Sequence, residues 1–175
     1  MVDAETVLGS IVLRKPKSLG RYDSYSGVVT SQRLIIAQMT SDMLKDAAQK
    51  ARDDAKAEGK GFFGQWSDQL KMSFNFSQRY LTMEPSAILS EAPENFALNN
   101  DEIKELKLNL KNIRQGNTNL HEFEMEVVSG SGKYEFRMDE KDENVNLFKQ
   151  VYGERVKMPF GYLSSHGFKL KLGLR

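Results

Sequence analysis

The sequence contains no cysteine, which excludes disulfides and thiolate metal sites. It has only two histidines, His121 and His166, and neither has a serine or a second histidine at a spacing typical of a catalytic or metal-binding motif. The segment Gly59-Lys60-Gly61 lacks the preceding glycine and the following serine or threonine of a phosphate-binding loop. We therefore expect a protein that is not an enzyme and that binds neither a metal nor a cofactor.

An excess of either charge sign is also lacking. Lys and Arg total 25 and Asp and Glu total 24, which gives a net charge of +1. Because nucleic-acid-binding domains normally carry a broad basic excess, we expect no nucleic-acid partner. No apolar run approaches the roughly 18 to 20 residues that span a bilayer, and the acidic start of the chain is unlike a signal peptide. These features favour a soluble, cytoplasmic protein.

What the chain does contain is a hydrophobic pattern that changes twice. Three β-type stretches, at about 7–13, 22–28 and 34–37, come first and are joined by short turns. After Pro93, four more stretches alternate between apolar and polar residues, at 96–98, 106–110, 123–127 and 134–138. Helical spacing then extends from Asp142 to Lys157. With 175 residues, the sequence predicts one α+β domain of about seven antiparallel strands closed by a C-terminal helix.

Between the two groups of strands, residues 40–93 are predicted to form a helical insertion. Ser41 is suited to cap a first helix, in which Leu44 and several alanines share one face. A glycine-rich bend separates this helix from a second one, and the simplest structure is a helical hairpin at about 41–83. The second helix has two apolar stripes, Phe63, Trp66, Leu70 and Phe74, and beside them Met72, Phe76, Tyr80 and Met83. The first helix can cover only one stripe, and we favour another chain over the sheet as the cover of the other.

Three segments resemble GRAM-like and bacterial pleckstrin-homology-like domains. The stretch Gly27–Ile36, with the sequence GVVTSQRLII, is similar to the family's strand-turn-strand signature of a small residue, a threonine and an Arg-Leu-Ile run. The stretch Phe96–Leu106 looks like the family's next strand and the bend after it. Tyr134-Glu135-Phe136, followed by the helix from Asp142, looks like the last strand and the capping helix. The resemblance covers about residues 5–39 and 95–157 and leaves out the insertion.

The resemblance implies a strongly curved antiparallel sheet capped by the C-terminal helix. It places a single domain at residues 1–157, interrupted by the insertion at about 40–93, with a basic tail at 158–175 that contains no acidic residue. Members of such families bind membrane lipids, peptides or partner domains, and few are enzymes. The resemblance therefore implies a binding role, although a fold alone does not say which ligand is bound.

Four cations flank the first predicted turn: Arg14, Lys15, Lys17 and Arg21. In lipid-binding pleckstrin-homology domains, basic residues at this loop hold headgroup phosphates through charge-assisted hydrogen bonds. The resemblance thus gives these residues a role in binding anionic lipid headgroups at a membrane surface. A solvated turn that happens to be basic is the alternative, and the sequence leaves both open.

The bend between the two insertion helices is followed by Phe62, Phe63 and Trp66, with Leu70 one turn further on. Aromatic residues of this kind form hot spots in protein interfaces or insert at a membrane surface, and packing inside the chain is the other alternative. We predict an interaction surface here for a partner protein or for a second copy of the chain, as in a homodimer. A protein-interaction module and a peripheral membrane module therefore both remain open.

The alternation also predicts which residues form the core. One face of the later strands should pack against one face of the C-terminal helix. These residues are Leu106, Leu108, Leu110, Phe123, Met125, Val127, Tyr134 and Phe136 on the strands, and Phe148 and Tyr152 on the helix.

Overall fold

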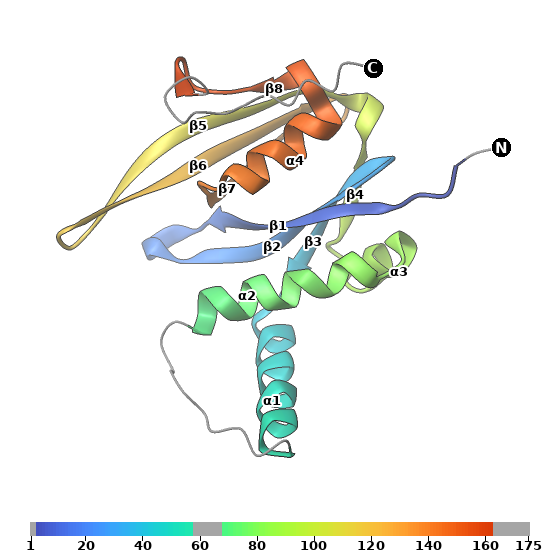
Figure 1. Ribbon diagram of the computed structural model, residues 1–175, viewed down its shortest axis with the longest axis vertical. Coiled ribbons are helices and arrows are strands. Elements are labelled where there is room, and N and C mark those ends of the chain that lie inside the picture. The colour runs from blue at the N-terminus through green and yellow to red at the C-terminus, as the bar shows by residue number, and fades with distance from the viewer. Residues whose placement is uncertain (1–2, 58–67, 163–175) are drawn as a thin grey trace.

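The computed structural model describes residues 3–57 and 68–162. Within these residues, eight strands form one open mixed sheet in the order β4-β3-β2-β1-β7-β6-β5-β8 (Figure 1). The first group of strands is β1 (Val7–Pro16), β2 (Tyr22–Thr30), β3 (Arg33–Met39) and β4 (Phe96–Asn99). The second group is β5 (Ile103–Gln115), β6 (Thr118–Ser129), β7 (Gly132–Asp139) and β8 (Val156–Lys157). The fold is α+β, as the sequence predicts.

The eighth strand follows from an early end of the C-terminal helix. This helix, α4 (Asp142–Tyr152), was expected to reach Lys157, but it stops where Gly153 adopts a φ of 56°. A positive φ of this kind is readily adopted only by glycine, which is why glycine so often follows the last helical residue. The chain then passes through a short 3-10 turn and adds β8 to the sheet, parallel to β5.

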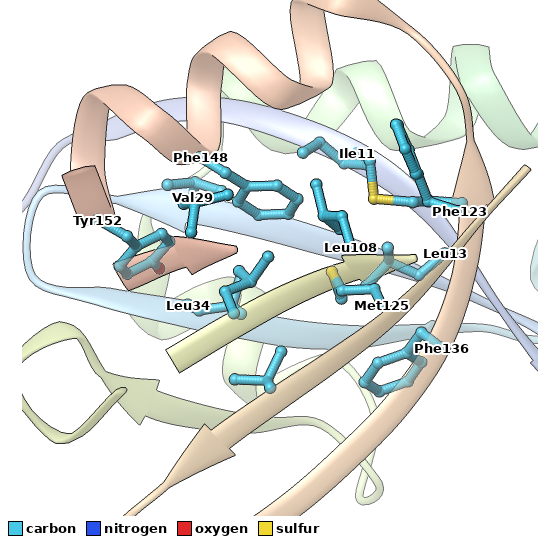
Figure 2. Close-up of a cluster of buried hydrophobic side chains, with 14 of the residues drawn as sticks. Ile11, Leu13, Val29, Leu34, Leu108, Phe123, Met125, Phe136, Phe148 and Tyr152 are labelled. Carbon is cyan, nitrogen blue, oxygen red and sulfur yellow. The ribbon is translucent and has the colours of Figure 1, made fainter. Parts of the chain in front are cut away.

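One core lies between the two groups of strands, where α4 is inserted (Figure 1). Phe148 and Tyr152 point from α4 into a cluster that includes Val29, Leu34 and Leu108 (Figure 2). Phe148 is completely buried, and Tyr152 donates a hydrogen bond of 2.9 Å from its hydroxyl to Oδ1 of the buried Asn100. The predicted core residues are buried or packed against this cluster, with the exception of Leu110.

Leu110 is 37% exposed, so its predicted burial is wrong. It shares a face with Phe123, its partner on β6. Beyond the next pair, Lys111–Glu122, β5 and β6 continue as a two-stranded ribbon past the end of α4 (Figure 1). The alternation of a strand predicts which face a residue occupies, but burial also requires that a second element extend as far as that residue.

The insertion contains α1 (Ser41–Ala57), α2 (Asp68–Gln78) and α3 (Pro85–Ser90), with a 3-10 turn at Arg79–Thr82. α2 lies across the face of β1–β3 opposite to α4, whereas α1 projects away from the sheet (Figure 1). Phe76, Tyr80 and Met83 pack in a second core with sheet residues that include Val28 and Ile35. The sheet therefore covers this stripe, and the expectation that another chain covers it is wrong, because α4 occupies only one face of β1–β3.

Strands β2 and β3 are consequently buried on both faces, which explains why Leu34–Ala37 is apolar without alternation. Leu34 and Ile36 belong to the core under α4, and Ile35 belongs to the core under α2. Where α2 crosses the sheet, the hydroxyls of Ser10, Ser26 and Ser77 hydrogen-bond to one another. This network satisfies polar groups at a contact that is otherwise apolar.

Replacing Phe148 with alanine should lower the free energy of unfolding by about 3 to 5 kcal/mol, because it leaves a cavity in a fully packed core. Urea denaturation followed by circular dichroism measures this loss. Phe160→Ala is the matched control, since the Phe160 side chain is fully exposed and its removal should change stability by less than about 0.5 kcal/mol. Equal effects of the two substitutions would contradict the role of α4 as the closing helix.

Candidate functional site

Strand β1 is paired along its whole length on one side only. β2 pairs with it from Val7 to Pro16, with an irregularity at Leu8 between Val7 and Gly9, whereas β7 pairs with it only at Leu13 and Arg14. Within the described residues, Leu8–Val12 therefore have no strand neighbour on the β7 side. An unpaired strand edge presents backbone N–H and C=O groups that can pair with another strand.

A cleft of about 700 Å³ lies along this free edge and is lined by five consecutive residues of β1, Leu8 to Val12. Successive side chains of a strand point to opposite faces of the sheet. Five consecutive residues can therefore reach one cleft only if the strand turns its backbone edge toward it. The base of this cleft, which we call the edge cleft, is the edge of β1.

Two helical segments form the walls of the edge cleft. One wall comes from the insertion and consists of Phe74, Gln78 and Leu81. The other comes from α4 and consists of Glu143, Asn144, Asn146, Leu147 and Gln150. Leu8, Phe74 and Leu81 are 41%, 45% and 42% exposed, and they are three of the eight large apolar side chains that are exposed in the described part of the chain. The edge cleft thus combines a polar wall on α4 with exposed apolar side chains opposite.

α4 approaches β1 closely at Gly9. A Cβ atom at this position would lie 2.5 Å from Cδ2 of Leu147 on α4, far inside van der Waals contact. With glycine at position 9, the helix lies directly over β1. β7 ends at Asp139 and the chain turns into α4, so the edge of β1 stays unpaired beyond Leu13.

Charged residues hold the two strands together at the end of the edge cleft, where β1 and β7 part. Arg14 and Arg137 form one of the two residue pairs between β1 and β7, so two like charges are adjacent. Glu122 of β6 forms ion pairs of 3.2 Å with both arginines, and Asp139 forms one of 2.8 Å with Arg14. Glu122 is only 5% exposed, although it alternates along β6 with the core residue Phe123.

Arg14 is therefore a structural cation. Burial lowers the pKa of its guanidinium, but the charges and hydrogen bonds of Asp139 and Glu122 outweigh burial, so that the net pKa lies above its ordinary value. Its side chain is only 13% exposed. A residue held in this way is not available to a lipid headgroup in the manner predicted for the four cations of the first turn.

The other three predicted cations lie at the β1–β2 turn itself. Lys17 forms an ion pair of 2.9 Å with Asp23, and Lys15 and Arg21 are exposed and form no ion pair with a described residue. Between them, Leu19 is 90% exposed and adopts a φ of 61°, an unfavourable conformation for a residue with a branched side chain. The turn thus presents an apolar tip flanked by basic residues, which we call the leucine turn (Lys15–Tyr22).

Sequence reasoning missed both the edge cleft and Leu19. An apolar residue between Ser18 and Gly20, inside a basic turn, was a usable signal for the leucine turn. The sequence carries no comparable signal for the edge cleft, because its parts come from β1, the insertion and α4 and meet only in the folded chain.

The predicted aromatic surface cannot be placed. Phe62, Phe63 and Trp66 lie outside the described residues, as does the side chain of Leu70. Among the residues that are described, no group of three histidine or acidic side chains could hold a metal ion. None of the helices in the described ranges is long and apolar enough to cross a bilayer.

Comparison with protein-family models, with curated proteins and with solved structures found no match. The contacts and exposed surfaces described above are therefore the observations from which a function can be argued.

Replacing Arg14 with alanine should lower the free energy of unfolding by about 3 kcal/mol, because it leaves Glu122 buried beside a single remaining cation. The neighbouring Lys15→Ala is the control and should change stability by less than about 0.5 kcal/mol, since Lys15 is exposed. Chemical denaturation of the two variants and the wild type measures both effects. If both substitutions were neutral, the ion pairs around Glu122 would not stabilise the junction of β1 and β7.

Proposed function

We propose that this protein is a non-catalytic binding domain with a pleckstrin-homology-like fold, and that it takes an extended peptide segment into the edge cleft. The observation that carries this proposal is the unpaired edge of β1 from Leu8 to Val12 at the base of a cleft. A peptide that adds a strand to such an edge gains main-chain hydrogen bonds, and its alternate side chains enter pockets on either side.

The walls of the edge cleft suit a peptide with alternating side chains. Side chains on one face of the added strand would contact Leu8, Phe74 and Leu81, which are apolar and exposed. Side chains on the other face would meet polar groups of α4, among them Glu143 and Asn144. Main-chain pairing would supply affinity that depends little on sequence, and the apolar wall would supply selectivity.

The order of the elements supports the pleckstrin-homology-like part of the proposal. Strands β1 to β4 are sequential neighbours, β5 to β7 are sequential neighbours, and a single helix packs between the two groups after the last long strand. This is the arrangement that the resemblance of Gly27–Ile36 and Tyr134–Phe136 implies.

The insertion supports a role in protein binding, because Phe74 and Leu81 form one wall of the edge cleft. An interaction surface or a dimer contact at Phe62, Phe63, Trp66 and Leu70 stays a prediction beside this one. The lining of the edge cleft includes no histidine, and its Asp139 is ion-paired with Arg14. Both features favour binding over acid–base catalysis.

To test the peptide site, a random heptapeptide library displayed on phage is selected against the full chain, and the enriched peptide is synthesised with a fluorescent label. Leu81→Lys should weaken binding of this peptide by tenfold or more in fluorescence anisotropy titrations. The reason is that a lysine places a charge on the apolar wall and removes contact area.

Leu120→Lys is the matched control. Leu120 is a similarly exposed leucine, 44% accessible, on the β5–β6 ribbon, and it is not among the residues that line the edge cleft. Its substitution should leave peptide binding unchanged. Equal losses from the two substitutions, or the absence of any enriched peptide, would refute a peptide site in the edge cleft.

The leucine turn favours a second candidate, binding to an anionic membrane surface. Leu19 could enter the interfacial region of a bilayer while Lys15 and Arg21 contact anionic headgroups. The unfavourable backbone conformation of Leu19 adds weight, because strained residues cluster at ligand-binding and switch regions.

Replacing Lys15 and Arg21 with glutamine should weaken binding to phosphatidylserine vesicles roughly thirtyfold at low salt, since each cation contributes about 1 kcal/mol. Co-sedimentation with vesicles measures the affinity. Lys45→Gln with Lys50→Gln removes the same charge from the exposed face of α1 and should have little effect. A wild-type chain that binds phosphatidylserine and phosphatidylcholine vesicles equally would exclude this candidate.

A further inference from the structure

The last residues of the chain have a strand-like sequence that no described element accounts for. From Phe168 to Leu174, the apolar residues Phe168, Leu170, Leu172 and Leu174 alternate with Lys169, Lys171 and Gly173. A strict period of two over seven residues is typical of a strand with one apolar face. This segment follows the last described residue, Tyr162.

The last described residue, Tyr162, is connected by a side-chain hydrogen bond to the segment that borders the edge cleft. Tyr162 is 4% exposed, its ring packs 5.4 Å from that of Phe123, and its hydroxyl donates a hydrogen bond of 2.8 Å to Oε1 of Glu140. Glu140 stands between Asp139 and Lys141, which both line the edge cleft. The backbone at Tyr162 therefore lies within two side-chain lengths of the backbone at Glu140, which is next to the end of the edge cleft where β1 and β7 separate.

The lengths agree. An extended chain covers about 3.3 Å per residue, so the six steps from Tyr162 to Phe168 reach roughly 20 Å, which is enough to enter the cleft. The segment Phe168–Leu174 and the edge of β1 from Arg14 to Leu8 also span six steps each, or roughly 20 Å.

The direction in which this segment would enter the cleft also matches the direction of β7 beside β1. β7 is antiparallel to β1 and runs toward lower β1 numbers, from the pair Arg137–Arg14 to the pair Met138–Leu13. After Asp139 the chain turns away into α4, so the positions opposite Val12 to Leu8 are left unfilled within the described residues. A segment that enters at the Arg14 end runs antiparallel to β1 and continues the line of β7.

We propose that Phe168–Leu174 docks in the edge cleft of its own molecule as an added strand antiparallel to β1. The four apolar side chains face Leu8, Phe74 and Leu81, and the two lysines face α4, where Glu143 supplies an opposite charge. This inference rests on the proposed function, because it names an intrinsic ligand for the same cleft. The docked segment occupies the cleft and competes with other peptides.

Docking within one molecule is favoured over docking between two copies. A short connection gives the segment an effective concentration on the order of millimolar at a site that it can reach. At micromolar protein concentration, the segment of another copy cannot compete with this value.

A single paramagnetic label tests the proposal on the full chain. Since the sequence has no cysteine, Arg175→Cys creates a unique site for a nitroxide. In a uniformly ¹⁵N-labelled sample, we expect the amide signals of Leu8–Val12 to lose intensity, while those of Leu110 and Leu120 on the β5–β6 ribbon keep theirs. Attenuation that is absent from Leu8–Val12, or equal in both regions, would overturn the proposal.

Two controls sharpen this result. In the variant Leu170→Lys with Leu172→Lys, the same label should no longer attenuate Leu8–Val12, because the apolar face of the strand is lost. Attenuation that persists there would overturn docking as an alternating strand. Attenuation that arises when spin-labelled chains without ¹⁵N are mixed with unlabelled ¹⁵N chains would show docking from a second copy and overturn the intramolecular arrangement.

Peptide binding separates this proposal from the proposed function. The synthetic peptide selected from the library should bind the Leu170→Lys, Leu172→Lys variant at least tenfold more tightly than the wild type, because the competing segment has been released. If that peptide binds both chains equally and still depends on Leu81, the intrinsic ligand is refuted and the peptide site stands. If no peptide binds in a way that depends on Leu81, the peptide site is refuted, whatever the paramagnetic label shows.

Discussion

The packing of α4 between the two groups of strands is the interaction on which the rest of the architecture depends. Phe148 and Tyr152 fill the space between the two groups of strands, and Leu147 lies against β1 over Gly9. β7 pairs with β1 only at Leu13 and Arg14, and after Asp139 the chain turns into α4. The turn that brings α4 into the core therefore also ends β7 and leaves the edge of β1 unpaired, so the edge cleft follows from how the domain is closed.

Two polar networks keep this open arrangement in register. At one end of α4, Asn100 donates a hydrogen bond to the backbone oxygen of Thr30 and accepts one from the Tyr152 hydroxyl, which joins β2 to the end of the helix. At the other end, Glu122 and Asp139 neutralise Arg14 and Arg137 where the strands part. Because unpaired polar groups are costly inside a protein, the first network favours one way of docking the helix and the second favours one junction of β1 with β7.

The insertion changes which surface of the sheet is exposed to a ligand. Without α2, the outer face of β1–β3 would expose Val28, Ile35 and Ala37, which form the second core with Phe76 and Tyr80. With α2 in place, that face is covered, and the exposed apolar residues Phe74 and Leu81 stand beside the free edge instead. The insertion thus replaces a broad apolar face with a narrow cleft, a shape that suits an extended chain better than a flat partner surface.

The sequence by itself determined the order of the main elements, because alternation, helical spacing and turn residues act over a few neighbouring positions. It identified seven of the eight strands, the insertion helices and the packing of Phe148 and Tyr152, and it placed Lys15, Lys17 and Arg21 at one turn, but it missed β8. Only the tertiary structure decided that Leu110 is exposed, that Glu122 is buried between two arginines, and that the sheet covers Phe76 and Tyr80. The edge cleft also belongs to this second group, because burial, charge pairing and strand-edge exposure depend on which distant segments reach the same place, and local patterns do not carry that information.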